Sequence, residues 1–276
     1  MTTRGSDAAE PRGKVLVIGK GVIGDATGYA LEQRGYEVTY HDPPNGIEGS
    51  PAGCSIVLLC VPTPMGALGY NSRSILYRCA DWLEQQGHRG LVGIRSTVVP
   101  GTCDQMQAEF PTMTWFSWPE FLQAARAREM AANAPYVVIG YLGLPVPAHE
   151  PIVALLPDAK MTMHTFPQAA EFAKYATNAL LAATVGVANE LAEYAKLLSI
   201  DYNVMVPPIC EMDSVLPSNV KQSPEGGFGG ACLPKDLAAL LFHASRDHGV
   251  TMPVLAAVDA ENRKRRPECY VGGGAQ

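Results

Sequence analysis

Short hydrophobic segments recur along the first 165 residues and predict the strands of one sheet. The segments are residues 14–18, 36–41, 55–60, 91–94, 112–116, 136–140 and 161–164. Most of them are continuously apolar, which is typical of strands that are buried on both faces of a parallel sheet. Helical spacing lies between several of them, including residues 74–86, so the pattern predicts an α/β fold with a doubly wound parallel sheet.

The sequence changes character after residue 165. Residues 168–198 are rich in Ala, Leu and Glu and contain no proline, which predicts one helix of roughly 45 Å. Its apolar positions cover more than one side, so we expect it to be buried between domains or between subunits. Further helices are expected beyond it, with breaks at residues 207–208 and 226–230, and a proline-rich loop is expected at residues 144–151.

Composition argues against several classes of protein. The 276 residues carry a formal net charge of −6, which argues against nucleic-acid binding. The one dense basic run, residues 263–266, is interpreted as the solvated tail of a helix. No apolar stretch reaches the roughly 18 residues of a membrane span. The polar first dozen residues predict a disordered tail and no signal peptide.

The cysteines indicate a reducing compartment. There are seven, an odd number, and they lack paired C-x-x-C spacing. Four of them lie in or beside apolar segments, where we expect small core side chains: Cys54, Cys60, Cys79 and Cys103. The six histidines do not cluster with cysteines or carboxylates. We therefore predict a cytoplasmic protein with no disulfide framework and no metal site.

A glycine-rich turn joins the first predicted strand to a helix. Gly19, Gly21 and Gly24 follow the strand in G-x-G-x-x-G spacing, and the second strand ends at Asp42. Such glycines let a pyrophosphate sit on a helix N-terminus, and an acidic residue at this place can bind a ribose diol. The turn therefore predicts a Rossmann-type dinucleotide-binding domain. NAD is favoured over NADP, because Asp42 would repel a 2′-phosphate.

A second glycine-rich stretch surrounds a cysteine. Residues 226–236 read G-G-F-G-G-A-C-L-P-K-D, which sets Cys232 among glycines and ahead of Lys235 and Asp236. The lysine favours a thiolate, the aspartate is an acid–base partner, and a helix starting near Pro234 adds its positive N-terminal end. This pattern is typical of covalent thiol chemistry. The alternative is a glycine-rich turn that holds a small buried cysteine.

The predicted long helix carries a second pair of polar candidates. Lys174 and Asn178 are four residues apart and share a face. Beside Cys232, an ammonium and a carboxamide can donate hydrogen bonds to an oxyanion or order a water molecule. The alternative is a surface lysine and a packing asparagine.

Polar residues also follow the predicted strands, at the sheet edge where ligands bind in such folds. Thr97 lies in S-T-V-V-P-G-T and can bind substrate or water, and Glu120 lies in W-P-E-F-L and can act as a general base. The run C-V-P-T-P, residues 60–64, offers rigid backbone to a nicotinamide pocket. The alternative for each is ordinary strand–helix turn chemistry.

Together these motifs resemble a known family. G-K-G-V-I-G, C-V-P-T-P, S-T-V-V-P-G-T, P-E-F-L, F-A-K-Y-A-T-N-A-L-L-A, N-E-L-A and G-G-F-G-G-A-C-L-P-K-D occur in this order between about residues 14 and 266. They resemble the UDP-glucose/GDP-mannose dehydrogenase family, and the last motif is highly specific. The resemblance implies an enzyme that oxidises the primary alcohol of a nucleotide sugar to a carboxylate with two molecules of NAD.

The resemblance also implies roles for individual residues. Cys232 resembles the nucleophile, Lys174 and Asn178 the oxyanion or water donors, Asp236 and Thr97 the water-ordering partners, and Glu120 the base of thioester hydrolysis. The cofactor-binding residues implied are Gly19, Gly21, Val22, Ile23, Gly24, Asp42, Val61, Pro62, Thr63, Thr97 and Lys235. The substrate-binding residues implied are Glu120, Phe121, Leu122, Lys174, Asn178, Lys221, Phe228 and Gly229. The long helix resembles the family's dimerisation helix, so a homodimer through residues 168–198 is expected.

We therefore expect a disordered tail at residues 1–13, a NAD-binding Rossmann-like domain at 14–165, a helical central domain with the catalytic cysteine at 166–266, and a flexible tail at 267–276. Members of the family continue into a second Rossmann-like domain that binds much of the nucleotide, and we expect this chain to be a short form without it. Residues 214–225 also lack the arginine expected there, with Lys221 as a substitute phosphate contact. A smaller substrate thus stays open. Two other functions stay open as well: a two-electron β-hydroxyacid-type dehydrogenase, and a non-catalytic NAD-binding subunit that needs a partner.

Overall fold

The computed structural model describes residues 11–66, 69–143, 146–197, 199–210, 226–230 and 232–270. They form two compact units. The first, here the sheet unit, comprises the described residues of Met1–Pro62, Ser74–Ser96 and Pro100–Glu171. The second, here the helical unit, comprises those of Thr63–Arg73, Thr97–Val99 and Phe172–Gln276. The domain limits expected from the sequence remain a prediction.

The sheet unit is built on seven strands. In chain order they are β1 (Lys14–Ile18), β2 (Glu37–His41), β3 (Ile56–Leu59), β4 (Leu91–Ile94), β5 (Thr114–Ser117), β6 (Tyr136–Tyr141) and β7 (Met161–Thr165). Their order across the sheet is β2-β1-β3-β4-β5-β6-β7. The order changes direction between β1 and β3, which is the switch point where ligands bind in open α/β sheets. The predicted α/β class is confirmed.

One part of the sheet differs from the all-parallel expectation. The strands β1 to β5 pair in parallel, but β6 pairs with β5 in antiparallel register, Phe116 opposite Tyr141, and β7 again runs parallel to β6. The reason lies in hydrogen bonding, which satisfies strand edges in either direction, so a buried apolar run does not encode its orientation.

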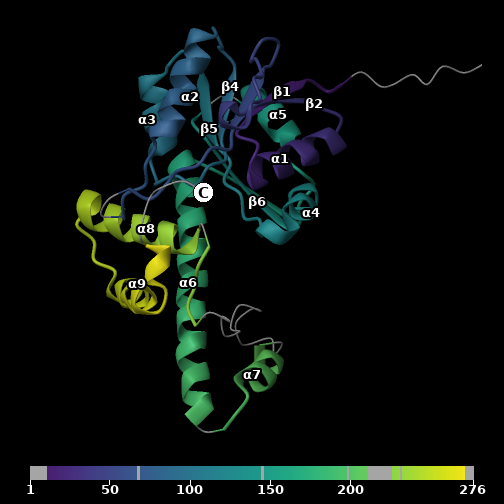
Figure 1. Ribbon diagram of the computed structural model, residues 1–276. Helices are drawn as coiled ribbons and strands as arrows, with labels where there is room; N and C mark the ends of the chain where they lie inside the picture. Colours follow the sequence, from purple (N-terminus) through teal and green to yellow (C-terminus); the bar gives the residue numbers. More distant parts are fainter. Residues whose placement is uncertain are drawn as a thin grey trace, which may run out of the picture. The chain divides into compact units, whose positions relative to one another are not determined.

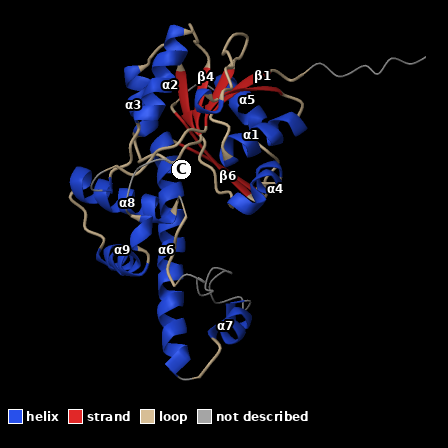
Figure 2. Cartoon of the chain, viewed as in Figure 1, coloured by secondary structure: helices blue, strands red, loops and turns tan. Residues whose placement is uncertain are grey.

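Helices cover both faces of this sheet (Figures 1 and 2). They are α1 (Val22–Gln33), α2 (Ser74–Gln85), α3 (Thr102–Glu109), α4 (Ala127–Ala132) and α5 (Val146–Leu155), with 3-10 turns at Pro43–Asn45 and Ala124–Arg126. In Figure 1, α2 and α3 lie on one side of the strands and α1, α4 and α5 on the other. Leu31 of α1 and Leu155 of α5 belong to one hydrophobic cluster with Val15 and Phe116 of the sheet. On the other side, Leu76 and Leu83 of α2 and Met106 of α3 are fully buried. The sheet is therefore buried on both faces, as its continuous apolar runs require.

The helical unit is organised along one helix. The helix α6 (Pro167–Leu197) is 31 residues long, close to the predicted span, and its first turn, to Glu171, belongs to the sheet unit. The other helices are α7 (Tyr202–Cys210), α8 (Leu233–His248) and α9 (Pro253–Arg265), with a 3-10 turn at Pro267–Cys269. Tyr175 and Ala179 of α6 pack with Leu237 and Leu240 of α8 in a second hydrophobic core. None of the helices in the described part of the chain is long and apolar enough to cross a membrane.

Two proline-rich stretches were expected to be irregular, and this expectation was wrong. The helix α5 begins at Val146 and contains Pro151, and α7 continues through residues 207–208 to Cys210. These prolines lie beyond the first turn of their helices, so each removes one backbone hydrogen bond, at a cost of about 3 kcal/mol. Their φ near −65° is still that of a helix, so a proline weakens a helix without always ending it.

Candidate active site

The glycine turn after β1 meets three different steric demands. Gly19 has a φ of +89°, and a Cβ there would lie 2.5 Å from the carbonyl oxygen of Cys60. A Cβ on Gly24 would lie 1.8 Å from the carbonyl oxygen of Gly19. Gly21 is the N-cap of α1, and nothing lies within 4 Å of the place of its Cβ.

These demands match the three roles that glycines have in a dinucleotide turn. The first allows a tight turn, the second leaves room for a pyrophosphate, and the third lets helix and strand pack closely. The open space at Gly21 lies at the N-terminus of α1, where backbone N–H groups and the helix dipole favour an anion. Val22 and Ile23 begin that helix. The turn therefore fits the dinucleotide that the sequence predicts.

The acidic residue after β2 is joined to this turn. Asp42 is buried, and its Oδ2 accepts hydrogen bonds from the backbone N–H of Lys20 (2.8 Å) and from Nδ2 of Asn45 (2.9 Å). Parallel pairing of β1 with β2 sets Ile18 opposite His41, which brings Asp42 beside the turn. A carboxylate held in this way suits a ribose diol.

The loops after β3 and β4 are fixed by hydrogen bonds within each unit. In the sheet unit, the Ser96 hydroxyl accepts from the N–H of Val61 (2.9 Å) and donates to its carbonyl (2.7 Å), next to Pro62. In the helical unit, the carbonyl of Thr97 accepts from the Thr63 hydroxyl (2.6 Å) and from Nδ2 of Asn71 (3.3 Å). Rigid backbone was expected at residues 60–64, and side-chain hydrogen bonds hold Val61 and Thr63 there. Asn71 was not among the sequence candidates.

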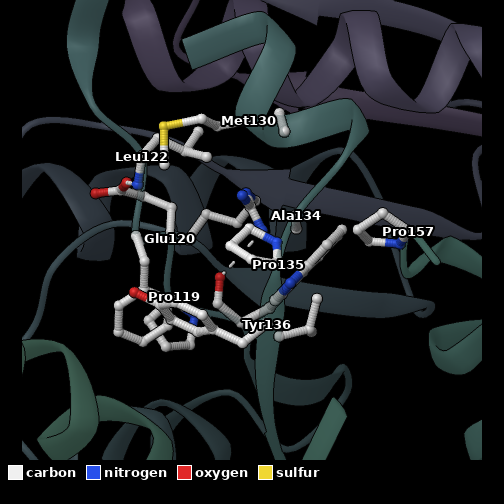
Figure 3. Close-up of a pocket in the computed structure, with 13 residues that line it drawn as sticks. Pro119, Glu120, Leu122, Met130, Ala134, Pro135, Tyr136 and Pro157 are labelled. Atoms are coloured by element: carbon white, nitrogen blue, oxygen red, sulfur yellow. Dashed lines mark hydrogen bonds between the residues drawn. The ribbon is translucent and has the colours of Figure 1, made fainter. Parts of the chain in front are cut away.

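Glu120 lines a small cavity of the sheet unit (Figure 3). It is buried, and its Oε2 accepts a hydrogen bond from the backbone N–H of Leu122 (2.6 Å). The cavity is about 40 Å³, which is enough for a water molecule. The lining residues are Arg95, Trp118, Pro119, Glu120, Phe121, Leu122, Met130, Ala131, Ala134, Pro135, Tyr136, Val137 and Pro157. A carboxylate beside a water-sized space is suited to general-base chemistry.

A buried arginine lies in the wall of the same cavity and was missed from the sequence. Arg95 stacks 4.0 Å from the centre of the Trp118 ring and donates from Nε to the Thr27 hydroxyl (2.9 Å) and from Nη1 to the Trp118 carbonyl (3.3 Å). Burial lowers the pKa of Arg95, and the nearby Cys60 and Glu120 oppose this effect. The cavity wall thus combines a buried cationic side chain with a buried carboxyl group.

Cys232 caps the N-terminus of α8 in the helical unit. Its carbonyl accepts the hydrogen bond from the N–H of Asp236 (2.8 Å), and Pro234 stands in the first turn of the helix, as predicted. Cys232 is exposed, so the alternative of a small buried cysteine is wrong. A helix N-terminus favours a thiolate, which is the reactive form of cysteine.

A cluster of polar side chains from α6 and α8 forms around Asp236, which follows this cysteine by four residues. Asp236 is 1% exposed, and its Oδ2 accepts a hydrogen bond of 2.5 Å from Nδ2 of the buried Asn178. Lys235 forms an ion pair with the same carboxylate. Lys174, one turn before Asn178, is 6% exposed, so the alternative of a surface lysine is wrong. Burying such groups is costly unless they are paired, which marks this cluster as a functional-site candidate.

The other residues implied to bind substrate are divided between the two units. Phe228 is buried in the core of the helical unit, next to Gly229 of the same glycine loop, and Phe121 packs on Tyr136 of the sheet unit. Lys221 lies outside the described residues. Among the described residues, no group of three His, Cys, Asp or Glu side chains is placed to hold a metal ion.

Four cysteines of the sheet unit were expected to be small core residues. Cys54 and Cys103 are buried, as the sequence predicted, whereas Cys60 and Cys79 are partly exposed. Burial raises the pKa of Cys60 and of Cys79 to about 11, and it raises the pKa of Cys103 and of Cys54 as well. These thiols are therefore protonated near neutral pH.

A glutamate at the start of α6 was also missed. Glu171 is buried, its Oε2 accepts from the N–H of Gly101 (2.6 Å), and its Oε1 accepts from the N–H of Cys103 (2.8 Å), at the N-terminus of α3. Burial raises its pKa to about 8, although these N–H groups oppose the shift. It stands three residues before Lys174 on the same helix, a spacing that offered the one sequence signal for it.

The arrangement defines a class of protein: an α/β unit with a glycine turn of the dinucleotide-binding type, and a helical unit with an exposed cysteine at a helix N-terminus. Residues 168–264 match the model of the central domain of the UDP-glucose/GDP-mannose dehydrogenase family. The resemblance predicted from the sequence motifs is therefore confirmed.

Curated relatives agree with this match. The chain is 28% identical to GDP-mannose 6-dehydrogenase of Pseudomonas aeruginosa over 285 residues, which cover 96% of this chain and 64% of that protein. It is 28% identical to UDP-glucose 6-dehydrogenase TuaD of Bacillus subtilis over 240 residues, which cover 82% of this chain and 49% of that protein. The chain thus spans about half to two thirds of the length of these relatives.

Solved structures share the fold. A UDP-glucose dehydrogenase from Pyrobaculum islandicum matches with a TM-score of 0.78 at 24% identity, covering 96% of this chain and 70% of that one. A 3-hydroxyisobutyrate dehydrogenase from Mycobacterium tuberculosis matches with a TM-score of 0.70 at 19% identity, covering 93% of this chain and 94% of that one. At these identities the likeness concerns the fold.

Proposed function

We propose that this chain is a NAD-dependent dehydrogenase that oxidises the primary alcohol of a nucleotide sugar to a carboxylate through a covalent intermediate on Cys232. The observation that carries the proposal is the exposed thiol at the N-terminus of α8, four residues before a buried carboxylate that is bonded to Asn178. A simple alcohol dehydrogenase has no need of this thiol. A second oxidation, from aldehyde to acid, does need it, because the aldehyde must first become tetrahedral.

The glycine turn and Asp42 hold the cofactor in this proposal. The pyrophosphate lies on the N-terminus of α1, where Gly21 leaves open space, and Asp42 accepts hydrogen bonds from the adenosine ribose. The rigid loops at Val61, Pro62, Thr63 and Thr97 border the nicotinamide, with Lys235 as a further contact. NAD supplies the acceptor for the hydride in each of the two oxidations.

The residues of the helical unit then perform the covalent step. The Cys232 thiolate adds to the aldehyde carbon, the carbonyl electron pair moves to oxygen, and a thiohemiacetal forms. Lys174 and Asn178 donate hydrogen bonds to that oxygen as it gains negative charge. Loss of hydride from the tetrahedral carbon leaves a thioester, with the sulfur still attached.

Hydrolysis completes the proposed cycle. Asp236 and Thr97 order a water molecule, Glu120 removes its proton, and the oxygen attacks the thioester carbon. The C–S bond breaks with its electron pair on sulfur, which restores the Cys232 thiolate and releases the carboxylate. Phe121, Leu122, Phe228 and Gly229 line the substrate, together with Lys221.

The proposal extends to assembly. The outer face of α6 exposes Leu180, Val187 and Leu191, the first of them to 70%. Exposed apolar residues gathered on one helix are typical of a protein interface, so we propose a homodimer through residues 168–198. The six free cysteines described are compatible with a reducing cytoplasm, which we propose as its compartment.

The test is the amount of NADH formed per substrate consumed, measured at 340 nm across UDP-glucose, UDP-N-acetyl sugars, GDP-mannose, nucleoside monophosphates and free sugars. Two NADH for one substrate, with a carboxylate product, are expected. Cofactor binding without turnover of any substrate would contradict the proposal and favour a NAD-binding subunit that needs a partner.

One observation favours a second candidate, a two-electron β-hydroxyacid-type dehydrogenase. The fold of 3-hydroxyisobutyrate dehydrogenase matches along 93% of this chain and 94% of that one, and Lys174 and Asn178 alone would serve such a reaction. It would yield one NADH per substrate, and Cys232→Ser would keep most of the activity.

A further inference from the structure

We propose that Asn262 of α9 is a positioning residue that clamps the glycine loop Gly226–Gly230 and so places Cys232 for its reaction. The inference rests on the proposed function of Cys232 and adds to it a scaffold on a different helix. No role was assigned to Asn262 from the sequence, and the basic run that follows it was interpreted as a solvated tail.

The clamp consists of two hydrogen bonds to one residue of the loop. Oδ1 of Asn262 accepts from the N–H of Phe228 (2.8 Å), and Nδ2 donates to the carbonyl of Phe228 (2.9 Å). The amide thus pairs with both backbone groups of Phe228, as a neighbouring strand would. Asn262 is 3% exposed and Phe228 is buried, so water competes little for these bonds.

Hydrogen bonds with Tyr270, which is itself bonded to Asp259, fix the orientation of the Asn262 amide. The Tyr270 hydroxyl donates to Oδ1 of Asp259 (3.0 Å) and accepts from Nδ2 of Asn262 (3.1 Å). Burial raises the pKa of Tyr270, so its hydroxyl keeps the proton that it donates. Arg263 pairs with the other oxygen of Asp259 at 2.7 Å and lies 4.0 Å from the centre of the Tyr270 ring. The network therefore allows one orientation of the amide, with Oδ1 toward the Phe228 N–H.

Two arginines of α9 and its C-terminal cap hold the rest of the loop. Nη1 of Arg265 donates to the carbonyl of Gly226 (3.4 Å). The guanidinium of Arg266 lies against Gly229, where a Cβ would stand 3.0 Å from Nη2. Both side chains are 19% exposed, so this part of the basic run is not a solvated tail. The end of α9 is thus a template for the loop.

The consequence follows from chain connectivity. Phe228 precedes Cys232 by four residues, and α8 begins directly after the cysteine. The clamp at Phe228 and the start of α8 thus lie on either side of the segment that carries Cys232. Catalysis is sensitive to such placement, because a shift of about 1 Å can cost roughly a hundredfold in rate.

The test compares Asn262→Ala with Tyr270→Phe, which keeps the clamp and removes the group that orients it. Lys264→Ala is the matched control, because Lys264 lies on the same helix with its side chain 75% exposed and pairs with Glu261 of that helix. Two quantities are measured: amide hydrogen exchange of the peptide with residues 226–230, and the kcat and KM of the wild-type substrate.

We expect Asn262→Ala to speed exchange in this peptide and to lower kcat about a hundredfold, with an unchanged KM for NAD. Tyr270→Phe should also speed exchange in this peptide, to a smaller extent, and should lower kcat about tenfold. Lys264→Ala should change neither quantity. Unchanged exchange in the loop of Asn262→Ala would overturn the proposal, as would faster exchange spread evenly over the whole chain. If the wild type oxidises no substrate of the panel, the proposed function fails, while the exchange arm still decides whether the clamp exists.

Discussion

The molecule contains two glycine-rich turns, and they need their glycines for different reasons. In the turn after β1, the Cβ positions of Gly19 and Gly24 are occupied by backbone carbonyls. In the loop before Cys232, the Cβ positions of Gly227 and Gly229 are crowded by side chains. These belong to Asn262 of α9 and to Arg266, which caps the end of that helix. Backbone cannot withdraw without unfolding a strand or helix, whereas a side chain can rotate.

This difference suggests that the two turns contribute to different properties, one to the stability of the fold and the other to the reaction. The first turn is determined by the packed backbone of the turn itself and of the strand end at Cys60, and it leaves open space at Gly21 for a ligand. The second loop is determined by side chains of and after α9, and it leads to the proposed nucleophile. Changes in the first turn should therefore affect folding and cofactor binding, and changes in the second should affect turnover.

The largest effect is expected from Cys232→Ser, which tests whether chemistry resides in the second loop. A serine hydroxyl is far less ionised than a thiol, so the covalent step should slow by about a thousandfold or more. NADH formation is followed at 340 nm, with free aldehyde as the substrate of the second half-reaction. The variant should bind NAD and unfold like the wild type. Retention of most activity would move the chain to the two-electron candidate.

The next effect is expected in the first turn, from Gly24→Ala paired with Gly21→Ala. Alanine at position 24 puts a Cβ 1.8 Å from a backbone oxygen and should cost more than about 3 kcal/mol of unfolding free energy. Alanine at position 21 meets no atom within 4 Å, and should change that free energy by less than about 1 kcal/mol.

The pair is measured by urea unfolding and by NAD titration. Gly21→Ala should weaken NAD binding by about tenfold, or 1.4 kcal/mol, because its methyl group takes the space of the pyrophosphate. Equal losses of unfolding free energy for both variants would contradict the conclusion that Gly24 is packed against backbone while Gly21 faces open space.

A smaller effect is expected from Gly227→Ala in the second loop. Its Cβ would stand 2.6 Å from Oδ1 of Asn262 and 2.9 Å from Cγ of Arg266, both on side chains that can move. We expect a loss of about 1–2 kcal/mol in stability and a decrease in kcat of about tenfold. Thermal unfolding and steady-state kinetics check this, with Gly143→Ala as the control, since its Cβ meets open space. A decrease in stability as large as that of Gly24→Ala would erase the contrast between the two turns.

The sequence predicted what is encoded locally. Continuous apolar runs located the strands to within about two residues, because burial on both faces leaves a pattern in the strand itself. The G-x-G-x-x-G turn was found because its glycines and Asp42 belong to one β-α-β unit. The exposed thiol followed from glycines beside it, which leave it uncrowded.

The parts that were missed depend on distant partners. Asn262 bonds to Phe228 across 34 residues and Glu171 to Gly101 across 70, so neither contact leaves a periodic or spacing signal. The antiparallel direction of β6 was missed for a related reason, because strand direction depends on the path of the chain between strands. Buried Arg95 shows the same limit, since it follows β4 and its partner Thr27 lies on α1, 68 residues away in the sequence.

The smallest effect is expected from Glu171→Gln, and it varies with pH. The ionised carboxyl accepts N–H bonds from Gly101 and Cys103 with its two oxygens, whereas glutamine and the protonated carboxyl each keep one carbonyl acceptor. Wild type and variant should therefore differ by less than about 1 kcal/mol at acidic pH.

The pKa of Glu171 is raised to about 8 by burial, so between the ordinary glutamate range and pH 8 the folded state binds more protons than the unfolded state. Stability from this group is therefore complete at low pH and is lost as pH rises toward 8, by at most roughly 1.4 kcal/mol per pH unit. Glutamine does not titrate, so in urea unfolding the variant should become more stable relative to the wild type from pH 5 to pH 8. Asp104 faces the same helix N-terminus and also raises this pKa, so Asp104→Asn should make this change smaller. Parallel stability curves for wild type and Glu171→Gln would show that this carboxylate is ionised throughout, and that the N-terminus of α3 binds it as a charge.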